Sequence, residues 1–228
     1  MRKYIIKNYT TGAADLWRLV SLHMLFALLS MVFVNIAPAN TYIKEWRLVK
    51  DDEAIQVYVI DVENTDIVKA RSVVIVKASL ERVKSVLNDI SHRHEWVPFL
   101  KQSSIIEKYS ENSRIEYSLF SAPWPASDRD FVYTLELKTN DAHKHIYEMQ
   151  SVVTSAMPEN SDRIRGEIYE SRYILTAIED ELTRVELIYH ADPKGWLPDW
   201  IINIIQKALP YKILKNLRHR LNEQAQDV

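Results

Sequence analysis

The sequence predicts an α+β fold in which a curved antiparallel β-sheet wraps around one long C-terminal helix. Most segments between Trp46 and His190 alternate apolar and polar residues with a period of two, the pattern of half-buried strands. One helical segment interrupts them early, and residues 192–200 (DPKGWLPDW) lead from the strands into a long apolar helix. Because this helix must bury its apolar stripe against the sheet, a cavity can remain between the two.

Strands are predicted wherever the alternation is regular and turn residues flank it. Alternation places Ile115, Tyr117 and Leu119 on one face of a strand, and Tyr133 and Leu135 on one face of the next. We expect these faces to point into the core, since a half-buried strand turns its apolar side inward. The predicted strands, joined mainly as a meander, are residues 46–49, 55–60, 68–77, 103–108, 114–120, 131–138, 145–154, 165–177 and 182–190.

Two main helices are predicted. Ser79 is a suitable N-cap for a helix over residues 80–90, where apolar residues recur at helical spacing, and a shorter helix or turn follows over 92–99. The last helix is expected from about Pro198 to Leu221, because proline suits a first helical turn. Pro210 is expected to kink it. Its apolar stripe begins with Trp200, Ile201, Ile204, Ile205, Ala208 and Leu209.

The composition excludes several classes of protein. The chain of 228 residues is long enough for one domain with a sizeable core. A net charge of −2 does not supply the basic surface that nucleic-acid binding needs, so no nucleic-acid partner is predicted. Because the chain has no cysteine, disulfides and thiolate chemistry are excluded, and its three glycines cannot form a Gly-rich phosphate-binding loop.

The N-terminal segment has the features of a secretory signal. Basic residues precede an almost wholly apolar run over residues 19–34, and Ala37-Pro38-Ala39 suits signal peptidase. We therefore expect residues 1–39 to be a signal peptide, residues 40–228 to be the domain, and the protein to be exported, either periplasmic or secreted. The alternatives are an uncleaved membrane anchor over residues 19–36 and a buried N-terminal helix.

Three short segments occur in a characteristic order along the chain. Residues 121–132 (SAPWPASDRDFV) combine a proline-containing turn with an Arg-Asp-Phe-Val entry into a strand, and residues 192–200 lead into the last helix. Asp89, Arg93 and Trp96 follow the internal helix at a regular spacing. In this order the segments resemble START domains, the lipid-transfer domains related to steroidogenic acute regulatory protein.

The resemblance covers about residues 42–221 and implies a helix-grip fold with a central cavity. It departs from the family where Val97 replaces an acidic residue and where an export signal replaces most of an N-terminal helical segment. It implies that the chain binds, and carries, a lipid or other hydrophobic molecule, with transient membrane contact. Arg129 is the residue expected to orient the head group, with Asp89 or Glu116 as its counter-ion.

The complete set of expected ligand-binding residues combines these charged groups with the apolar faces. It is Arg129, Asp89, Arg93, Glu116, Tyr117, Leu119, Tyr133, Leu135, Leu187, Tyr189, Trp200, Ile201, Ile204 and Ile205.

Three structural alternatives stay open at this point. Arg129 can instead pair with Asp128 or Asp130 and hold a turn. Asp89 and Arg93 can form a surface ion pair on a helix. The apolar faces can pack without a cavity, with the tryptophans Trp196 and Trp200 as core aromatics.

The same residues also allow an enzymatic function to be considered. A cyclase, aromatase or hydrolase acting on an apolar substrate can use the same cavity, as polyketide cyclases of related fold do. No catalytic residue, cofactor or metal is predicted, because the two histidine pairs, His92 with His94 and His143 with His145, lack a third ligand at a recognisable spacing. No Gly-x-Ser-x-Gly motif is present either.

Overall fold

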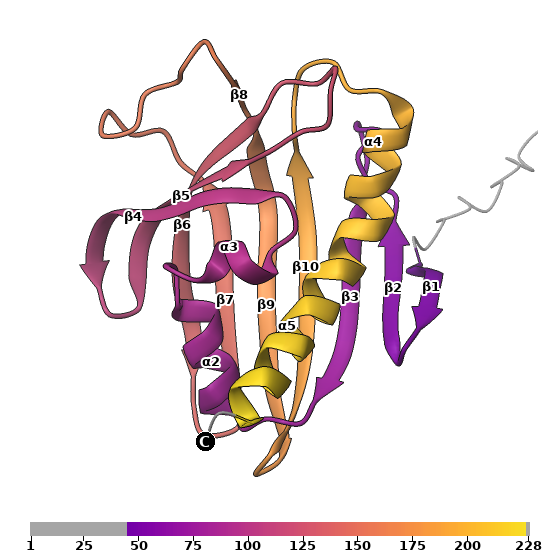
Figure 1. Cartoon of the computed structure of the whole chain (residues 1–228), viewed down its shortest axis with the longest axis vertical. Helices are drawn as coiled ribbons and strands as arrows, with labels where there is room; N and C mark the ends of the chain where they lie inside the picture. The colour runs from indigo at the N-terminus through magenta and orange to yellow at the C-terminus, as the bar shows by residue number, and fades with distance from the viewer. Residues whose placement is uncertain (1–44, 227–228) are drawn as a thin grey trace, which may run out of the picture. The chain divides into compact units, whose positions relative to one another are not determined.

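One curved sheet forms the frame of the structure, a computed structural model that describes residues 45–226 (Figure 1). Its strands within that range are β1 (Arg47–Asp52), β2 (Ile55–Ile60), β3 (Lys69–Val76), β4 (Leu100–Ser110), β5 (Ser113–Phe120), β6 (Arg129–Asn140), β7 (Lys144–Ser151), β8 (Ile164–Arg165), β9 (Glu167–Glu179) and β10 (Leu182–Asp192). Nine of them are antiparallel neighbours in the order β1-β2-β3-β10-β9-β7-β6-β5-β4, and β8 pairs parallel with β6. The predicted meander is confirmed, while the predicted signal peptide, residues 1–39, lies outside the described residues.

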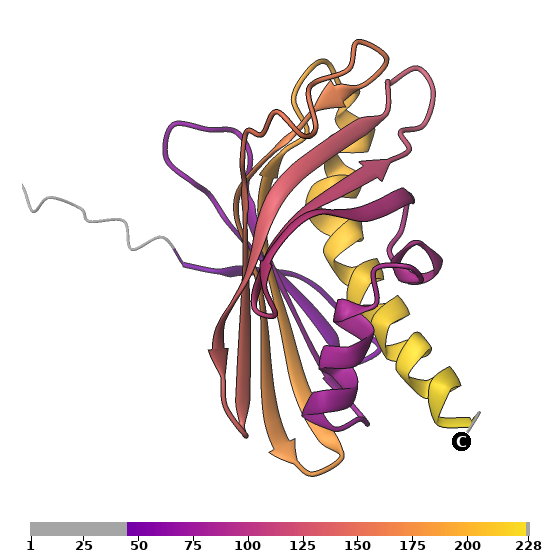
Figure 2. The same cartoon turned by 90° about the vertical axis from the view of Figure 1, so that its left-hand side faces the viewer.

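The helices cover one face of this sheet. They are α2 (Leu80–Asn88), α3 (Arg93–Trp96), α4 (Asp199–Asn203), the π-helical turn η1 (Ile204–Ala208) and α5 (Leu209–Gln226). Figure 2 shows α2, α3 and α5 on the side toward which the sheet curves. The Ser79 hydroxyl accepts a hydrogen bond from the backbone N–H of Arg82 at 3.4 Å, which confirms Ser79 as the N-cap of α2.

The last helix differs from its prediction around the two prolines. Pro198 is the N-cap of α4 rather than a residue of its first turn. Ahead of Pro210 the chain forms the π-helical turn η1 instead of a simple kink in an α-helix. Because Pro210 has no N–H to donate and its ring crowds the preceding turn, the wider π turn accommodates it where a regular α-helix would not.

The sheet and α5 pack most tightly around three leucines of the helix. Leu214, Leu217 and Leu221 of α5 are fully buried against the core that includes Leu175 and Val185 of the sheet. Each fully buried leucine of this kind contributes about 1.5–3 kcal/mol of stability. This packing anchors α5 to the sheet; of the cavities described below, one lies beside α2 and α3 and another beneath α4 and η1.

Candidate functional site

Two cavities lie between the sheet and the helices, and we call them the inner and the outer chamber. The inner chamber has a volume of about 120 Å³. Its lining residues are Leu87, Asn88, Arg93, Trp96, Val97, Leu100, Ser118, Phe120, Phe131, Tyr133, Leu135, Tyr147, Met149, Ile168, Ser171, Tyr173, Leu187, Tyr189 and Ile213. The sheet therefore supplies most of its wall, and α2 and α3 close its side.

The outer chamber lies beneath α4 and η1 and has a volume of about 120 Å³. Its lining residues are Phe99, Phe120, Ser121, Ala122, Pro123, Arg129, Phe131, Tyr189, Pro193, Leu197, Ile201, Ile204, Ile205, Leu209 and Ile213. Apart from Arg129 and Ser121, this wall is built from apolar residues and Tyr189. It suits a hydrocarbon chain, since apolar area removed from water gains about 25 cal/mol per Å².

Four side chains line both chambers and therefore stand between them: Phe120, Phe131, Tyr189 and Ile213. The rings of Phe120 and Phe131 meet edge to face, with centroids 5.8 Å apart and an interplanar angle of 85°. Tyr189 also lines a third cavity of about 310 Å³, beside β3 and the loop that enters α4. The chambers thus adjoin at an aromatic boundary.

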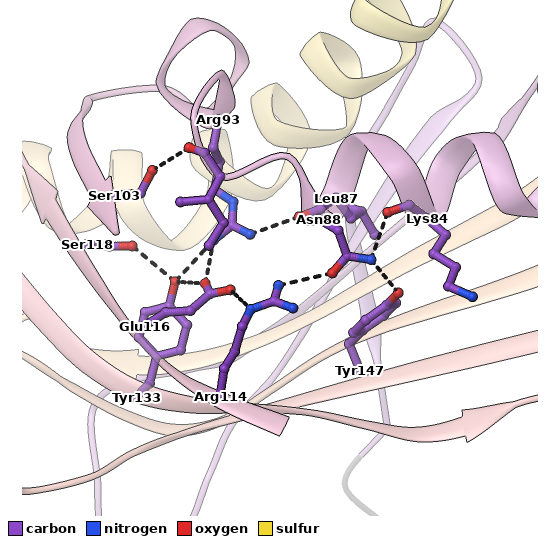
Figure 3. Close-up of polar contacts among 11 residues, drawn as sticks. Lys84, Leu87, Asn88, Arg93, Ser103, Arg114, Glu116, Ser118, Tyr133 and Tyr147 are labelled. Atoms are coloured by element: carbon purple, nitrogen blue, oxygen red, sulfur yellow. Dashed lines mark hydrogen bonds and ion pairs between the residues drawn. The ribbon is translucent and has the colours of Figure 1, made fainter. Parts of the chain in front are cut away.

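A buried ionic cluster borders the inner chamber (Figure 3). The Arg93 Nη1 of α3 lies 2.5 Å from Oε2 of Glu116, and the Arg114 Nε lies 2.6 Å from Oε1 of the same carboxylate. Glu116 is fully buried. The Tyr133 hydroxyl donates to Glu116 Oε2 at 2.9 Å, and Arg93 Nη2 donates to the Leu87 carbonyl at 2.8 Å.

The charges of this cluster do not balance. Two guanidinium groups share one carboxylate, and no other acidic side chain in residues 45–226 forms an ion pair with Arg93 or Arg114. Burial opposes ionisation of Glu116, but Arg93 and Arg114 outweigh it and lower its pKa, so the carboxylate stays charged. The cluster therefore carries a surplus of one positive charge, and Arg93 presents it to the inner chamber.

Arg129 lines a cavity, as its predicted role requires, but its partners differ from the predicted ones. Its guanidinium lines the outer chamber and donates to backbone carbonyls, those of Ser127, Lys194 at 3.2 Å and Trp196 at 3.0 Å. The predicted counter-ions are wrong, because Glu116 pairs with Arg93 and Arg114. The alternative pairing with Asp128 or Asp130 is also absent from the described ion pairs: those carboxylates bind Lys101, Arg163 and Arg165 instead. Arg129 fixes the loop before α4 to the start of β6.

Asp89 and Trp200 lie away from the chambers. The Asp89 carboxylate caps the next turn, where its Oδ2 lies 2.8 Å from Nδ1 of the exposed His92. It is neither a counter-ion of Arg129 nor an ion-pair partner of Arg93, whose guanidinium turns inward to β5. Trp200 is 49% exposed and lines no chamber, so its predicted place in the wall is wrong. Trp196, weighed as a core aromatic, is 67% exposed.

The predicted inward face of β5 is also wrong. Ile115 and Tyr117 form a separate apolar cluster with Val132 of β6, and Leu119 packs against it. The inward face of β5 carries Glu116 and Ser118 instead. The reason is that β5 is covered on both sides: Met157, from the long loop after β7, packs on the face that would otherwise meet water. Tyr117 and Leu119 therefore do not line either chamber.

The remaining predicted residues are brought together at the chambers. Tyr133, Leu135, Leu187 and Tyr189 line the inner one, and Ile201, Ile204 and Ile205 line the outer one. Sequence reasoning missed Arg114, Ser171 and Tyr173. Arg114 alternates with apolar residues, as Glu116 does, and this pattern is typical of a solvated strand face. Only their mutual pairing and burial identify them.

The comparisons with known proteins agree with this architecture. The START domain model matches residues 37–227 of the chain. Phosphatidylcholine transfer protein of Bos taurus is 26% identical over 176 residues, which cover 75% of this chain and 82% of that protein. A STAR-related lipid transfer protein from Xanthomonas axonopodis has a solved structure that is 30% identical, with a TM-score of 0.67, over 78% of this chain and 98% of that one.

Human StAR-related lipid transfer protein 5 shares the fold at lower identity. Its structure superposes with a TM-score of 0.73 at 18% identity, over 93% of this chain and 98% of that one. The family model spans the whole described part of the chain. The chain therefore belongs to the START domain family.

Proposed function

We propose that the chain binds one lipid molecule in the inner and outer chambers and carries it between membranes. The observation that carries this proposal is a buried cluster with surplus positive charge at the wall of a largely apolar cavity. A relative from Bos taurus named for phosphatidylcholine transfer supports the same function. The hydrocarbon chains of a lipid suit the outer chamber, and its polar head group suits the inner one.

We further propose that the head group contains a phosphate. Arg93 is the charged group that both lines the inner chamber and belongs to the cluster. A phosphate oxygen beside its guanidinium would cancel the surplus charge and form a charge-assisted hydrogen bond, which a sterol hydroxyl cannot match. This moves the head-group role from Arg129 to Arg93.

We favour binding over catalysis at these chambers. Among the described residues, no histidine and no carboxylate lines either one. A cyclase or hydrolase needs a side chain that can transfer a proton near neutral pH. Burial and then the Glu116 charge raise the pKa of Tyr133, and its hydroxyl is held by Glu116 and Ser118, so it is poorly suited to that task.

Transient membrane contact is proposed at the rim of the outer chamber. Trp124 is 90% exposed and lies one residue beyond Pro123, which lines that chamber. Trp196 and Trp200 flank Leu197, another lining residue, and are also exposed. Tryptophan prefers the interface between water and lipid, so these side chains suit a surface from which a lipid enters. Among residues 45–226, no helix has the length and apolar character needed to cross a bilayer.

Export of the domain remains a proposal from the sequence. If residues 1–39 are a cleaved signal, N-terminal sequencing of the product purified from its native host begins at residue 40. A product that keeps Met1 and sediments with membranes would instead support the anchor over residues 19–36.

A transfer assay tests the proposed function. Donor vesicles carry fluorescent phosphatidylcholine with a quencher, and acceptor vesicles carry neither. The protein is expected to accelerate the rise in fluorescence in proportion to its concentration. Replacing Trp124 by serine should slow transfer without changing stability, because the side chain is almost fully exposed. Tyr109→Ser, an exposed aromatic on β4, serves as the control and should transfer lipid normally.

A further inference from the structure

One buried hydroxyl in the inner chamber has no partner. Ser171 of β9 is only 3% exposed, and its Oγ forms no hydrogen bond with any residue that the structure describes. The same side chain lines the inner chamber. Burying a hydroxyl without a hydrogen bond opposes folding, because the group gives up water and gains nothing in exchange. A ligand in the chamber can supply the missing partner.

Two tyrosine hydroxyls accompany Ser171 on this wall. Tyr189 of β10 lies directly opposite Ser171 in the strand register, and Tyr173 lies two residues further along β9, on the same face. Both tyrosines line the inner chamber, and neither hydroxyl has a hydrogen-bond partner within residues 45–226. Burial raises the pKa of each to about 12, so both keep their protons and can donate.

These side chains extend from the ionic cluster to the boundary with the outer chamber. Tyr173 lies close enough to the ionic cluster for its pKa to respond to the charges of Arg93 and Glu116. Tyr189 lines the outer chamber as well as the inner one. The sequence of environments is therefore a cationic group, then neutral donors, then a wall that is apolar apart from Arg129 and Ser121. A glycerophospholipid has the same order, with its phosphate first, its ester carbonyls next and its hydrocarbon chains last.

We propose that Ser171, Tyr173 and Tyr189 form a binding subsite for the ester carbonyl oxygens of an acyl-linked phospholipid. The inference rests on the proposed lipid-binding function and specifies the bond by which the chains are attached. A carbonyl oxygen accepts hydrogen bonds from such hydroxyls, whereas the oxygen of an alkyl ether is a much weaker acceptor. An ether lipid of the same shape would leave the three hydroxyls unpaired.

A competition between two matched lipids tests the subsite. The protein is incubated with vesicles containing equal amounts of dioleoyl phosphatidylcholine and its di-O-octadecenyl ether, then separated from them. Mass spectrometry of the extracted lipid gives the bound ester-to-ether ratio. We expect the ester to be enriched about fivefold or more, the size of one or two net hydrogen bonds. Ser171→Ala, Tyr173→Phe and Tyr189→Phe, made singly and together, should bring the ratio toward one.

Ser72→Ala is the matched control. The Ser72 Oγ is also buried without a partner, and Ser72 lies opposite Leu187 in the register, but it lines no chamber. Its replacement should leave the ester-to-ether ratio unchanged. Each single substitution removes one hydroxyl and keeps the surrounding packing, and thermal unfolding checks that every variant is folded.

The outcomes separate the subsite from the proposed function. If the wild-type protein binds both lipids equally, or if the triple variant keeps the ester preference, the subsite is wrong while lipid binding stands. If neither lipid is bound, the proposed function and the subsite are both contradicted. A preference that disappears in the triple variant and persists in Ser72→Ala supports the subsite.

Discussion

Arg93 of α3 and Glu116 of β5 lie 2.5 Å apart, Nη1 to Oε2, although 23 residues separate them in the sequence. The contact ties the short helix to the sheet at the wall of the inner chamber. Because Arg114 shares the same carboxylate, Arg93 is held in place without being neutralised. This geometry gives the cavity its cationic end, and it leads to predictions that separate ligand binding from folding.

Removing Arg93 should strongly reduce phospholipid binding while the protein stays folded. In Arg93→Met the remaining pair, Arg114 and Glu116, is electrically balanced, so no uncompensated buried charge results. The bound phosphatidylcholine measured after incubation with vesicles should fall by about tenfold or more, as expected for a lost charge-assisted hydrogen bond. Arg114→Met removes the same charge but does not alter the chamber wall, so it should reduce binding less. Equal losses in both variants would contradict the assignment of Arg93.

Removing the carboxylate should instead destabilise the protein. Glu116→Gln leaves two buried guanidinium groups without a counter-charge, which costs about 3 kcal/mol or more. Chemical denaturation should show this loss in the free energy of unfolding. Glu111→Gln, which breaks the exposed ion pair with Lys108, is the control and should leave stability unchanged. A fully stable Glu116→Gln protein would refute the charge balance described above.

Stability should fall as the pH drops below about 6.5. Burial lowers the pKa of His145 and of His190, with Lys84 and Lys69 acting in the same direction, so the folded protein disfavours the charged form of both rings. Since each folded pKa lies below the unfolded value of 6.5, the unfolded chain takes up protons first as the pH falls. The free energy of unfolding, measured from pH 7.5 to 5, should therefore decrease as the pH falls.

This pH dependence of the unfolding free energy should arise from the buried rings of His145 and His190. His145→Gln is expected to flatten it, whereas replacement of the exposed His219 by glutamine should leave it unchanged. A slope that survives the substitution of both His145 and His190 would show that other groups titrate.

Arg129 should control the mobility of the segment that covers the outer chamber. Its guanidinium donates to several carbonyls at once, and a lysine ammonium cannot reproduce that planar arrangement. Arg129→Lys is therefore expected to cost about 1–3 kcal/mol and to speed hydrogen exchange in residues 194–205. Arg47→Lys, at an exposed ion pair with Asp61, is the comparison. Exchange rates equal to wild type in residues 194–205 would contradict this role.

Local patterns predicted the fold well but the site only in part. The alternation of strands, the Ser79 cap and the apolar stripe of the last helix are local features, and they gave the correct order of elements. The face of β5 was misjudged because Met157, distant in sequence, covers the side that carries Tyr117. The sequence of β5 itself cannot predict that a distant loop packs on this face.

The charged residues of the site were the least predictable. Arg93 and Glu116 were both candidates, yet their pairing depends on how α3 is placed over β5. Arg129 was expected to orient a head group; it lines the outer chamber, but its guanidinium donates its hydrogen bonds to the loop before α4. Ser171 was missed because a serine on a strand carries no signal until burial and the absence of a partner identify it.

Native mass spectrometry of the full chain, after incubation with phosphatidylcholine vesicles and separation from them, tests the central claim most directly. The account predicts a complex heavier than the polypeptide by one phospholipid, present in the wild-type protein and in Ser72→Ala and strongly reduced in Arg93→Met. A spectrum showing only the mass of the unliganded polypeptide would contradict it.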